Sequence, residues 1–154
     1  MIKMIFSGIV IILLTTACSA INANRQSKIK QGITGRVTIQ SGNYFPSPNR
    51  PTPKPKGLMT VVYVYEKTNI IQTEIKDAAP LFKLVKSKLI TQTNTDSAGY
   101  FKIALPIGSY SLFVKKGNAY YANNFDKQNN INVFIVEKKK VTTVSINDNS
   151  GTTQ

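Results

Sequence analysis

Short stretches in which apolar residues recur at every second position follow one another from Ile33 to Ile146, with turn-forming residues between most of them. In the first stretch Ile33, Val37 and Ile39 share one face, which is the period of a half-buried strand. Several short strands separated by turns are typical of two antiparallel sheets packed face to face. We therefore expect an all-β fold, a seven-stranded antiparallel β-sandwich, with strands at residues 33–39, 58–67, 88–95, 100–105, 109–115, 131–136 and 141–146.

The stretch at residues 58–67 is apolar on both faces and rich in β-branched and aromatic residues, which predicts a central strand. Turn residues at 96–99 and 106–108 predict two successive tight hairpins. Residues 137–140 turn the last pair of strands, and their three adjacent lysines discourage edge-to-edge aggregation.

Two segments do not follow the strand pattern. Residues 41–57 hold five of the seven prolines, so they are expected to form an extended surface loop. Residues 68–87 are ambiguous. Four residues with helical spacing favour a short helical turn that Pro80 would end, namely Ile70, Ile71, Glu74 and Ile75.

The first seventeen residues have the three parts of an export signal. Lys3 is the positive region, residues 5–14 are apolar, and Ala17 is the small residue before the only cysteine, Cys18. A membrane anchor that is retained would need about 20 apolar residues. An ordinary secretory signal cut elsewhere would leave a free thiol in an oxidising compartment. Thr15 stands where bacterial lipoproteins prefer Leu, yet the segment most closely resembles their lipid-attachment signal.

This resemblance implies that Cys18 carries a thioether-linked diacylglycerol and that the mature chain is an exported lipoprotein of the cell envelope, in the outer membrane. Residues 1–17 are then the signal peptide. Residues 18–31 are polar, hold Arg25, Lys28 and Lys30, and are expected to be a flexible basic tether. The membrane is the first expected partner, through acylated Cys18.

The turns and strands also resemble a known domain. Residues 95–101 read Thr-Asp-Ser-Ala-Gly-Tyr-Phe and residues 105–110 read Leu-Pro-Ile-Gly-Ser-Tyr, following strands at 32–37 and 62–66. This succession is similar to the carboxypeptidase regulatory-like domain, a transthyretin-like or prealbumin-like sandwich. The resemblance covers residues 32–147 and leaves 148–154 as a polar tail. It implies a module that is itself non-catalytic.

The residue inventory argues against an enzyme. The chain has no histidine, which excludes Ser-His-Asp and Cys-His sites, and it has only seven carboxylates. We expect no cofactor and no metal. Calcium is the one metal that the side chains suit, because oxygen ligands occur at Asn94, Asp96, Asn123, Asn124 and Asp126, but these are also the usual turn residues.

The formal charge of +13 favours anionic partners, and export removes the chain from nucleic acid. The candidate basic patch consists of Lys115, Lys116, Lys138, Lys139 and Lys140. Two candidate binding loops carry aromatic residues, one with Asn43, Tyr44, Phe45 and Arg50 and the other with Tyr120, Tyr121 and Phe125. The alternatives are a solvated lysine surface and aromatic residues that cover the edge of the core.

We therefore expect a non-catalytic, membrane-anchored envelope lipoprotein whose sandwich serves binding or assembly. One alternative is a charge-driven binder of anionic lipid or glycan. Another is an accessory module that acts in trans on a separate envelope protein such as a peptidase or a transporter.

Overall fold

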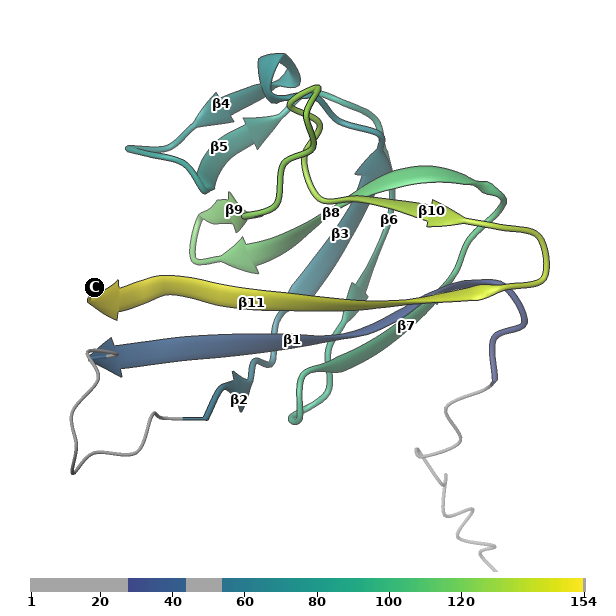
Figure 1. The fold of residues 1–154 in the computed structure, drawn as a ribbon, viewed down its shortest axis with the longest axis horizontal. Coiled ribbons are helices and arrows are strands. Elements are labelled where there is room, and N and C mark those ends of the chain that lie inside the picture. Colours follow the sequence, from purple (N-terminus) through teal and green to yellow (C-terminus); the bar gives the residue numbers. More distant parts are fainter. Residues whose placement is uncertain (1–27, 44–53, 154) are drawn as a thin grey trace, which may run out of the picture.

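The computed structural model describes residues 28–43 and 54–153, which form two packed β-sheets (Figure 1). The four-stranded sheet contains β1 (Gly32–Asn43), β2 (Lys56–Gly57), β7 (Tyr100–Ala104) and β11 (Val141–Thr153). The seven-stranded sheet contains β3 (Val61–Glu66), β4 (Thr73–Ile75), β5 (Leu81–Val85), β6 (Leu89–Asn94), β8 (Gly108–Lys116), β9 (Ala119–Tyr121) and β10 (Val133–Val136). The expected all-β sandwich is confirmed, and every one of the seven predicted stretches overlaps a strand. The two hairpins expected at residues 96–99 and 106–108 are wrong, because these turns join strands of different sheets: β7 pairs with β1, whereas β6 and β8 both pair with β3. Turn residues show where the chain reverses but not which sheet the next strand enters.

One pairing departs from the antiparallel pattern. Strands β1 and β11 run parallel and side by side along their whole length, from Gly32 beside Val141 to Asn43 beside Thr153 (Figure 1). Residues 148–153, expected to be a polar tail, therefore belong to the sheet, and the expected domain boundary at residue 147 is wrong. The ladder with β1 pairs the backbone of these polar residues, and a hydrophobic pattern does not reveal such pairing.

The main core lies between the two sheets and follows from the alternation within each strand. Val37 from β1 and Val144 from β11 meet Val62 from β3 and Leu112 from β8, and all four side chains are buried. Strand β3 lies between β6 and β8, as its apolar character on both faces predicted. Burial of side chains of this size from two facing sheets is the main stabilising contribution to such a fold.

A second cluster covers the outer face of the seven-stranded sheet. Tyr65 and Phe113, which point away from the main core, pack edge-to-face with ring centroids 5.5 Å apart, and Phe82 from β5 packs on Phe113 at 5.7 Å. The hairpin of β4 and β5 closes this cluster from the side. The central strands of this sheet are thus covered by apolar side chains on both faces.

The ambiguous segment 68–87 contains both a helical turn and strands. A 3-10 turn, η1 (Ile70–Gln72), is capped by the side chain of Asn69, so the expected turn is present at its start. Glu74 and Ile75, however, belong to β4, because β4 pairs with β5. Within the described residues no helix is long and apolar enough to cross a membrane.

Candidate functional site

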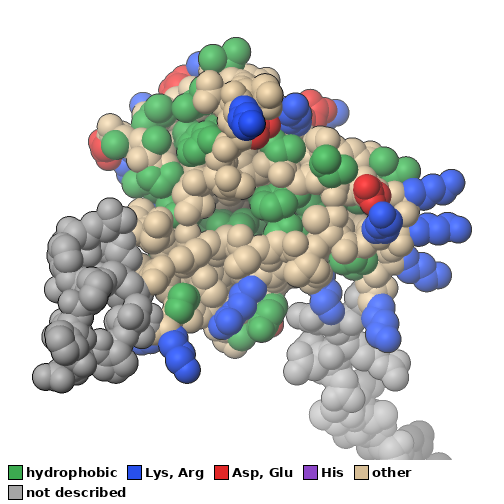
Figure 2. Space-filling view, viewed as in Figure 1, with side chains coloured by type: hydrophobic (Ala, Val, Ile, Leu, Met, Phe, Trp, Pro, Cys, Tyr) green, Lys and Arg blue, Asp and Glu red, His purple; other side chains and the backbone are tan. Residues whose placement is uncertain are grey.

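The sandwich has two chemically different ends. At one end the segments 28–32, 104–108 and 135–141 come together. Gly32 N–H donates to the Lys140 carbonyl at 3.1 Å, Gln31 Nε2 donates to the Leu105 carbonyl at 2.9 Å, and Val136 pairs with Gly108. We call this the basic end, because the lysines of the β10–β11 turn project from it (Figure 2).

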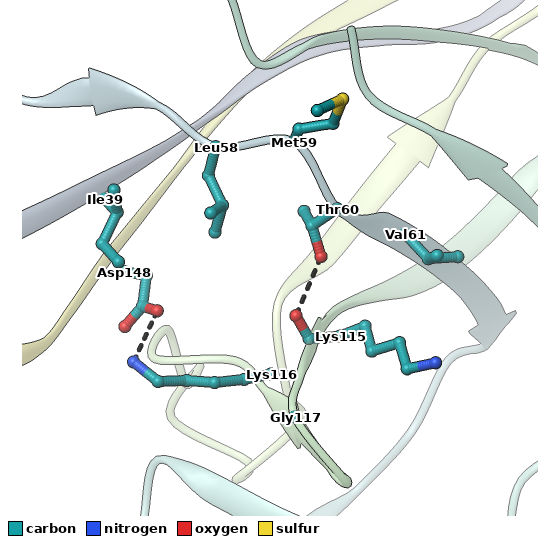
Figure 3. Close-up of a pocket in the computed structure, with 9 residues that line it drawn as sticks. All are labelled: Ile39, Leu58, Met59, Thr60, Val61, Lys115, Lys116, Gly117 and Asp148. Carbon is teal, nitrogen blue, oxygen red and sulfur yellow. Dashed lines mark hydrogen bonds and ion pairs between the residues drawn. The ribbon is translucent and has the colours of Figure 1, made fainter. Parts of the chain in front are cut away.

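The far end lies where Ile39 of β1 pairs with Asp148 of β11, about 23 Å along the sheet from Gly32 at 3.3 Å per residue. An open depression at this end, the far-end pocket, has a volume of about 420 Å³ (Figure 3). Its lining residues come from four strands and their connections, namely Ile39, Leu58, Met59, Thr60, Val61, Lys115, Lys116, Gly117 and Asp148.

The rim of the far-end pocket is held by a threonine that sequence reasoning did not single out. The buried Thr95 hydroxyl donates to the Leu58 carbonyl at 2.7 Å and accepts the Thr60 N–H at 2.7 Å. The Thr60 hydroxyl in turn donates to the Lys115 carbonyl at 2.8 Å. These bonds fix the segment before β3 and leave Met59 at the rim with 72% of its surface exposed.

A buried ion pair forms the floor of the far-end pocket. Lys116 Nζ lies 2.6 Å from Asp148 Oδ2, and the Asp148 residue is only 1% exposed (Figure 3). Ser150 donates to the other carboxylate oxygen through its N–H at 3.1 Å and through its hydroxyl. The Lys116 amine also bonds the Ser150 hydroxyl and lies 5.8 Å from the centroid of the Tyr121 ring. The Lys116 amine and the Asp148 carboxylate are therefore both paired within the protein.

Sequence reasoning missed this pair because it placed Asp148 in a tail. The alternation that puts Val144 and Ile146 in the core continues to Asp148, and the alternation through Leu112 and Val114 continues to Lys116. Because residues two apart share a face of a strand, both charged side chains enter the sandwich at its far end. Extending the two patterns by one further step would have placed each charged side chain on an inner face, but only the folded structure brings the two together.

A smaller depression of about 240 Å³ lies beside the far-end pocket on the outer face of the seven-stranded sheet. Lys83, Lys115 and Asn118 line it together with two tyrosines, Tyr63 and Tyr120, whose ring centroids are 5.2 Å apart. Burial, and after it a hydrogen bond with Tyr120, raises the pKa of Tyr65 beneath them, so this phenol stays protonated. The surface here combines aromatic edges with exposed lysines.

The aromatic residues of the second candidate loop have different environments. Tyr120 lines the smaller depression and is half-buried, while Phe125 is exposed and lies 6.5 Å from Phe82 between ring centroids. Tyr121, which was expected in a binding surface, is fully buried in the main core. Its hydroxyl donates within 2.9 Å to the Asn147 carbonyl, and burial raises its pKa. The expectation is wrong for Tyr121, because neighbouring residues of a strand point to opposite faces.

The first candidate loop is largely outside the described residues. Tyr44, Phe45 and Arg50 lie there, and Asn43 is the last residue of β1. The loop was expected at residues 41–57, so β1 extends three residues into it, to Asn43, through its ladder with β11, and β2 occupies its last two residues.

The single basic patch expected from the lysines is wrong. Strand β8 starts at Gly108 beside Val136 at the basic end and reaches Lys115 and Lys116 at the far end. Lys138, Lys139 and Lys140 lie in the turn at the basic end. The two groups are separated by the length of a strand, and Lys116 is already paired with Asp148.

Two of the residues considered for calcium, Asp96 and Asp126, serve as turn caps. Asp96 Oδ1 accepts the N–H groups of Ala98 and Tyr100, at 2.9 and 2.8 Å. Asp126 accepts from the Asn130 side chain at 2.8 Å, and this bond, with those from backbone N–H groups, lowers the pKa of its carboxyl. Nowhere in the described part of the chain do three acidic, cysteine or histidine side chains come together in a metal-binding group.

Comparison of the chain with protein-family models, with curated proteins and with solved structures finds no match.

The buried ion pair generates a stability prediction. Lys116→Ala is expected to lower the free energy of unfolding by about 2 kcal/mol, because it leaves the Asp148 carboxylate buried without its cation while Lys116 itself is partly exposed. The adjacent Lys115→Ala removes an equal charge from an exposed position and is expected to change stability by less than about 0.5 kcal/mol. Urea unfolding measures both, and equal losses would contradict the assignment.

The Asp126 cap generates a pH prediction. Its carboxyl has a pKa below the ordinary value of 3.8, so the cap contributes fully above that pH and is lost as the pH falls through the lower folded value. A carboxyl ¹³C titration followed by NMR is expected to give a midpoint below 3.8. Asn130→Ala removes the bond that lowers the pKa most and is expected to move the midpoint upward. An unchanged midpoint in this variant would show that another group sets the pKa.

Proposed function

We propose that this chain is a non-catalytic binding module of the cell envelope, anchored in the membrane by acylated Cys18, with its far end available to a protein partner. The proposal includes the resemblance of its turn motifs to carboxypeptidase regulatory-like domains, which are non-catalytic sandwiches. Nucleic acid is not a proposed partner.

The observation that carries the proposal is that the far-end pocket and the first described residues lie at opposite ends of the sandwich. The described chain begins at Lys28 at the basic end, and the far-end pocket lies about 23 Å away along β1. Attachment through residues before Lys28 therefore leaves the pocket free to face a partner. Recognition surfaces are commonly carried in this way on connections that a rigid sheet positions.

The far-end pocket suits a partner's side chain better than a reacting substrate. Leu58, Ile39 and the exposed Met59 supply apolar surface, and Lys115 supplies one exposed cation at the rim. Exposed methionine adapts its shape to different apolar partners. The carboxylate at the floor, Asp148, is held by Lys116 and Ser150.

The other carboxylates support a binding role, because most have a structural task. Asp96 and Asp126 cap turns, Glu74 lies 3.1 Å from Lys86, and Glu137 pairs with Lys140. These groups stabilise the fold, and such ion pairs at the surface contribute little each.

Metabolic labelling with palmitate tests the anchor. The full chain is expected to incorporate label and to fractionate with membranes, whereas Cys18→Ser is expected to lose the label. Thr15→Leu places the preferred residue three positions before Cys18 and is expected to label at least as well as the unaltered chain. Equal labelling of the full chain and Cys18→Ser would refute acylation at this residue.

Site-specific photocrosslinking in intact cells tests the binding surface. A photoreactive residue at Met59 is expected to give a discrete crosslinked protein band, because Met59 lies exposed on the rim of the far-end pocket. The same residue at Tyr100, which is also exposed but lies on the four-stranded sheet, is the matched control and is expected to give none. Identical bands from both positions, or no band from either, would contradict a partner at the far end.

A further inference from the structure

The basic end joins three segments that are distant in the sequence, and their lysines gather there. Lys28 and Lys30 precede β1, and Lys138, Lys139 and Lys140 form the turn before β11. Lys139 N–H donates to Gln31 Oε1 at 2.9 Å, so this turn is bonded directly to the segment through which the chain enters the fold. All five lysines are exposed.

Negative charge is scarce at this end. Glu137 is the one carboxylate in the three segments, and it pairs with Lys140. Elsewhere lysines are interspersed with acidic residues, as Lys86 is with Glu74 and Lys116 with Asp148. Five lysines therefore outnumber a single carboxylate at the end where the fold begins (Figure 2).

Large apolar side chains stand exposed among these lysines. Ile107, at the β7–β8 turn, is 61% exposed, and Ile135, on β10 just before the lysine turn, is also 61% exposed. Val141, the first residue of β11 after the turn, is exposed as well. Gly108, next to Ile107, pairs with Val136, next to Ile135, which places the two isoleucines at one end. Apolar residues ringed by cations are typical of a surface that contacts lipid headgroups and the upper acyl chains.

We infer that the basic end is a membrane-docking face, in which the lysines bind anionic lipid headgroups and Ile107 inserts among them. This inference rests on the proposed anchor and adds an orientation to it. Nine residues lie between Cys18 and Lys28, so the ten steps of chain from one to the other span at most about 35 Å, which limits the distance of the domain from the bilayer but not its tilt. Docking of the basic end sets the tilt, and the far-end pocket then faces away from the membrane.

Vesicle co-sedimentation tests the inference without the acyl group. The protein used is the chain from residue 18 carrying Cys18→Ser, with circular dichroism and thermal unfolding of each variant confirming that it is folded. It is expected to bind vesicles that contain phosphatidylglycerol and not vesicles of phosphatidylcholine alone. Binding is expected to weaken between about 0.05 and about 0.5 M salt, because screening shortens the reach of the charges.

A matched pair of triple variants separates a docking face from net charge. Lys138→Gln/Lys139→Gln/Lys140→Gln is expected to lower the partition coefficient about 100-fold, at about fivefold for each lysine near the surface. Lys54→Gln/Lys56→Gln/Lys127→Gln removes the same charge from exposed positions away from the basic end and is expected to lower it less than about threefold. Equal losses in the two triple variants would overturn the inference.

Ile107→Ser tests insertion and is expected to lower binding about tenfold at unchanged charge. No effect of Ile107→Ser, together with displacement of the protein from vesicles by a soluble acidic polysaccharide, would identify a soluble polyanion as the occupant and overturn the inference. Equal binding to phosphatidylcholine vesicles would do the same. The vesicle assay uses no acyl chain, so its failure leaves the labelling result at Cys18 standing, and loss of labelling leaves the vesicle result standing.

Discussion

The parallel ladder between β1 and β11 is the constraint on which the rest of the structure depends. It places Gly32 beside Val141, so the start of the domain is bonded to the lysine turn, and it places Ile39 beside Asp148, so a carboxylate enters the sandwich at the other end. A parallel pair needs a long connection, and all the other strands of the domain lie in the segment that joins these two. The positions of the groups at both ends of the domain therefore follow from the register of the single β1–β11 pair.

Strand β8 connects the two ends through the other sheet. It begins at Gly108, beside the basic end, and its inner face runs through Leu112 and Val114 to Lys116. The ion pair between Lys116 and Asp148 then joins the last inner position of β8 to β11. A buried pair of this kind contributes modestly to net stability, yet a change of register would leave one charge without its partner at large cost. The pair therefore links the two sheets at the far end.

The candidate sites show which expectations from the sequence the structure confirms. The apolar character of both faces correctly predicted that β3 is a central strand. Alternation correctly predicted the inner face of β1 at Ile33 and Val37, because a period of two is a property of the extended backbone itself. Grouping Tyr121 with Tyr120 failed for the same reason, since adjacent residues of β9 face opposite sides of the sheet. Grouping Lys115 with Lys138 failed because their proximity depends on the course of β8 and β10, which the sequence does not display. Thr95 was not predicted as important because its hydroxyl forms hydrogen bonds with backbone groups about 35 residues away in the sequence, which a local pattern does not indicate.

Local sequence was sufficient for the all-β class and for the approximate bounds of seven strands, because side-chain periodicity and turn residues act within a few positions. It located the turns at 96–99 and 106–108 but not the sheets whose strands they join. The partners of each strand required the folded structure, and with them the extension of β11 to Thr153, the Lys116–Asp148 pair and the separation of the two lysine groups. Strand pairing depends on which buried faces fit together across the whole chain, and many pairings are compatible with one local pattern. The basic end and the far-end pocket form only when the strands pair in this one arrangement.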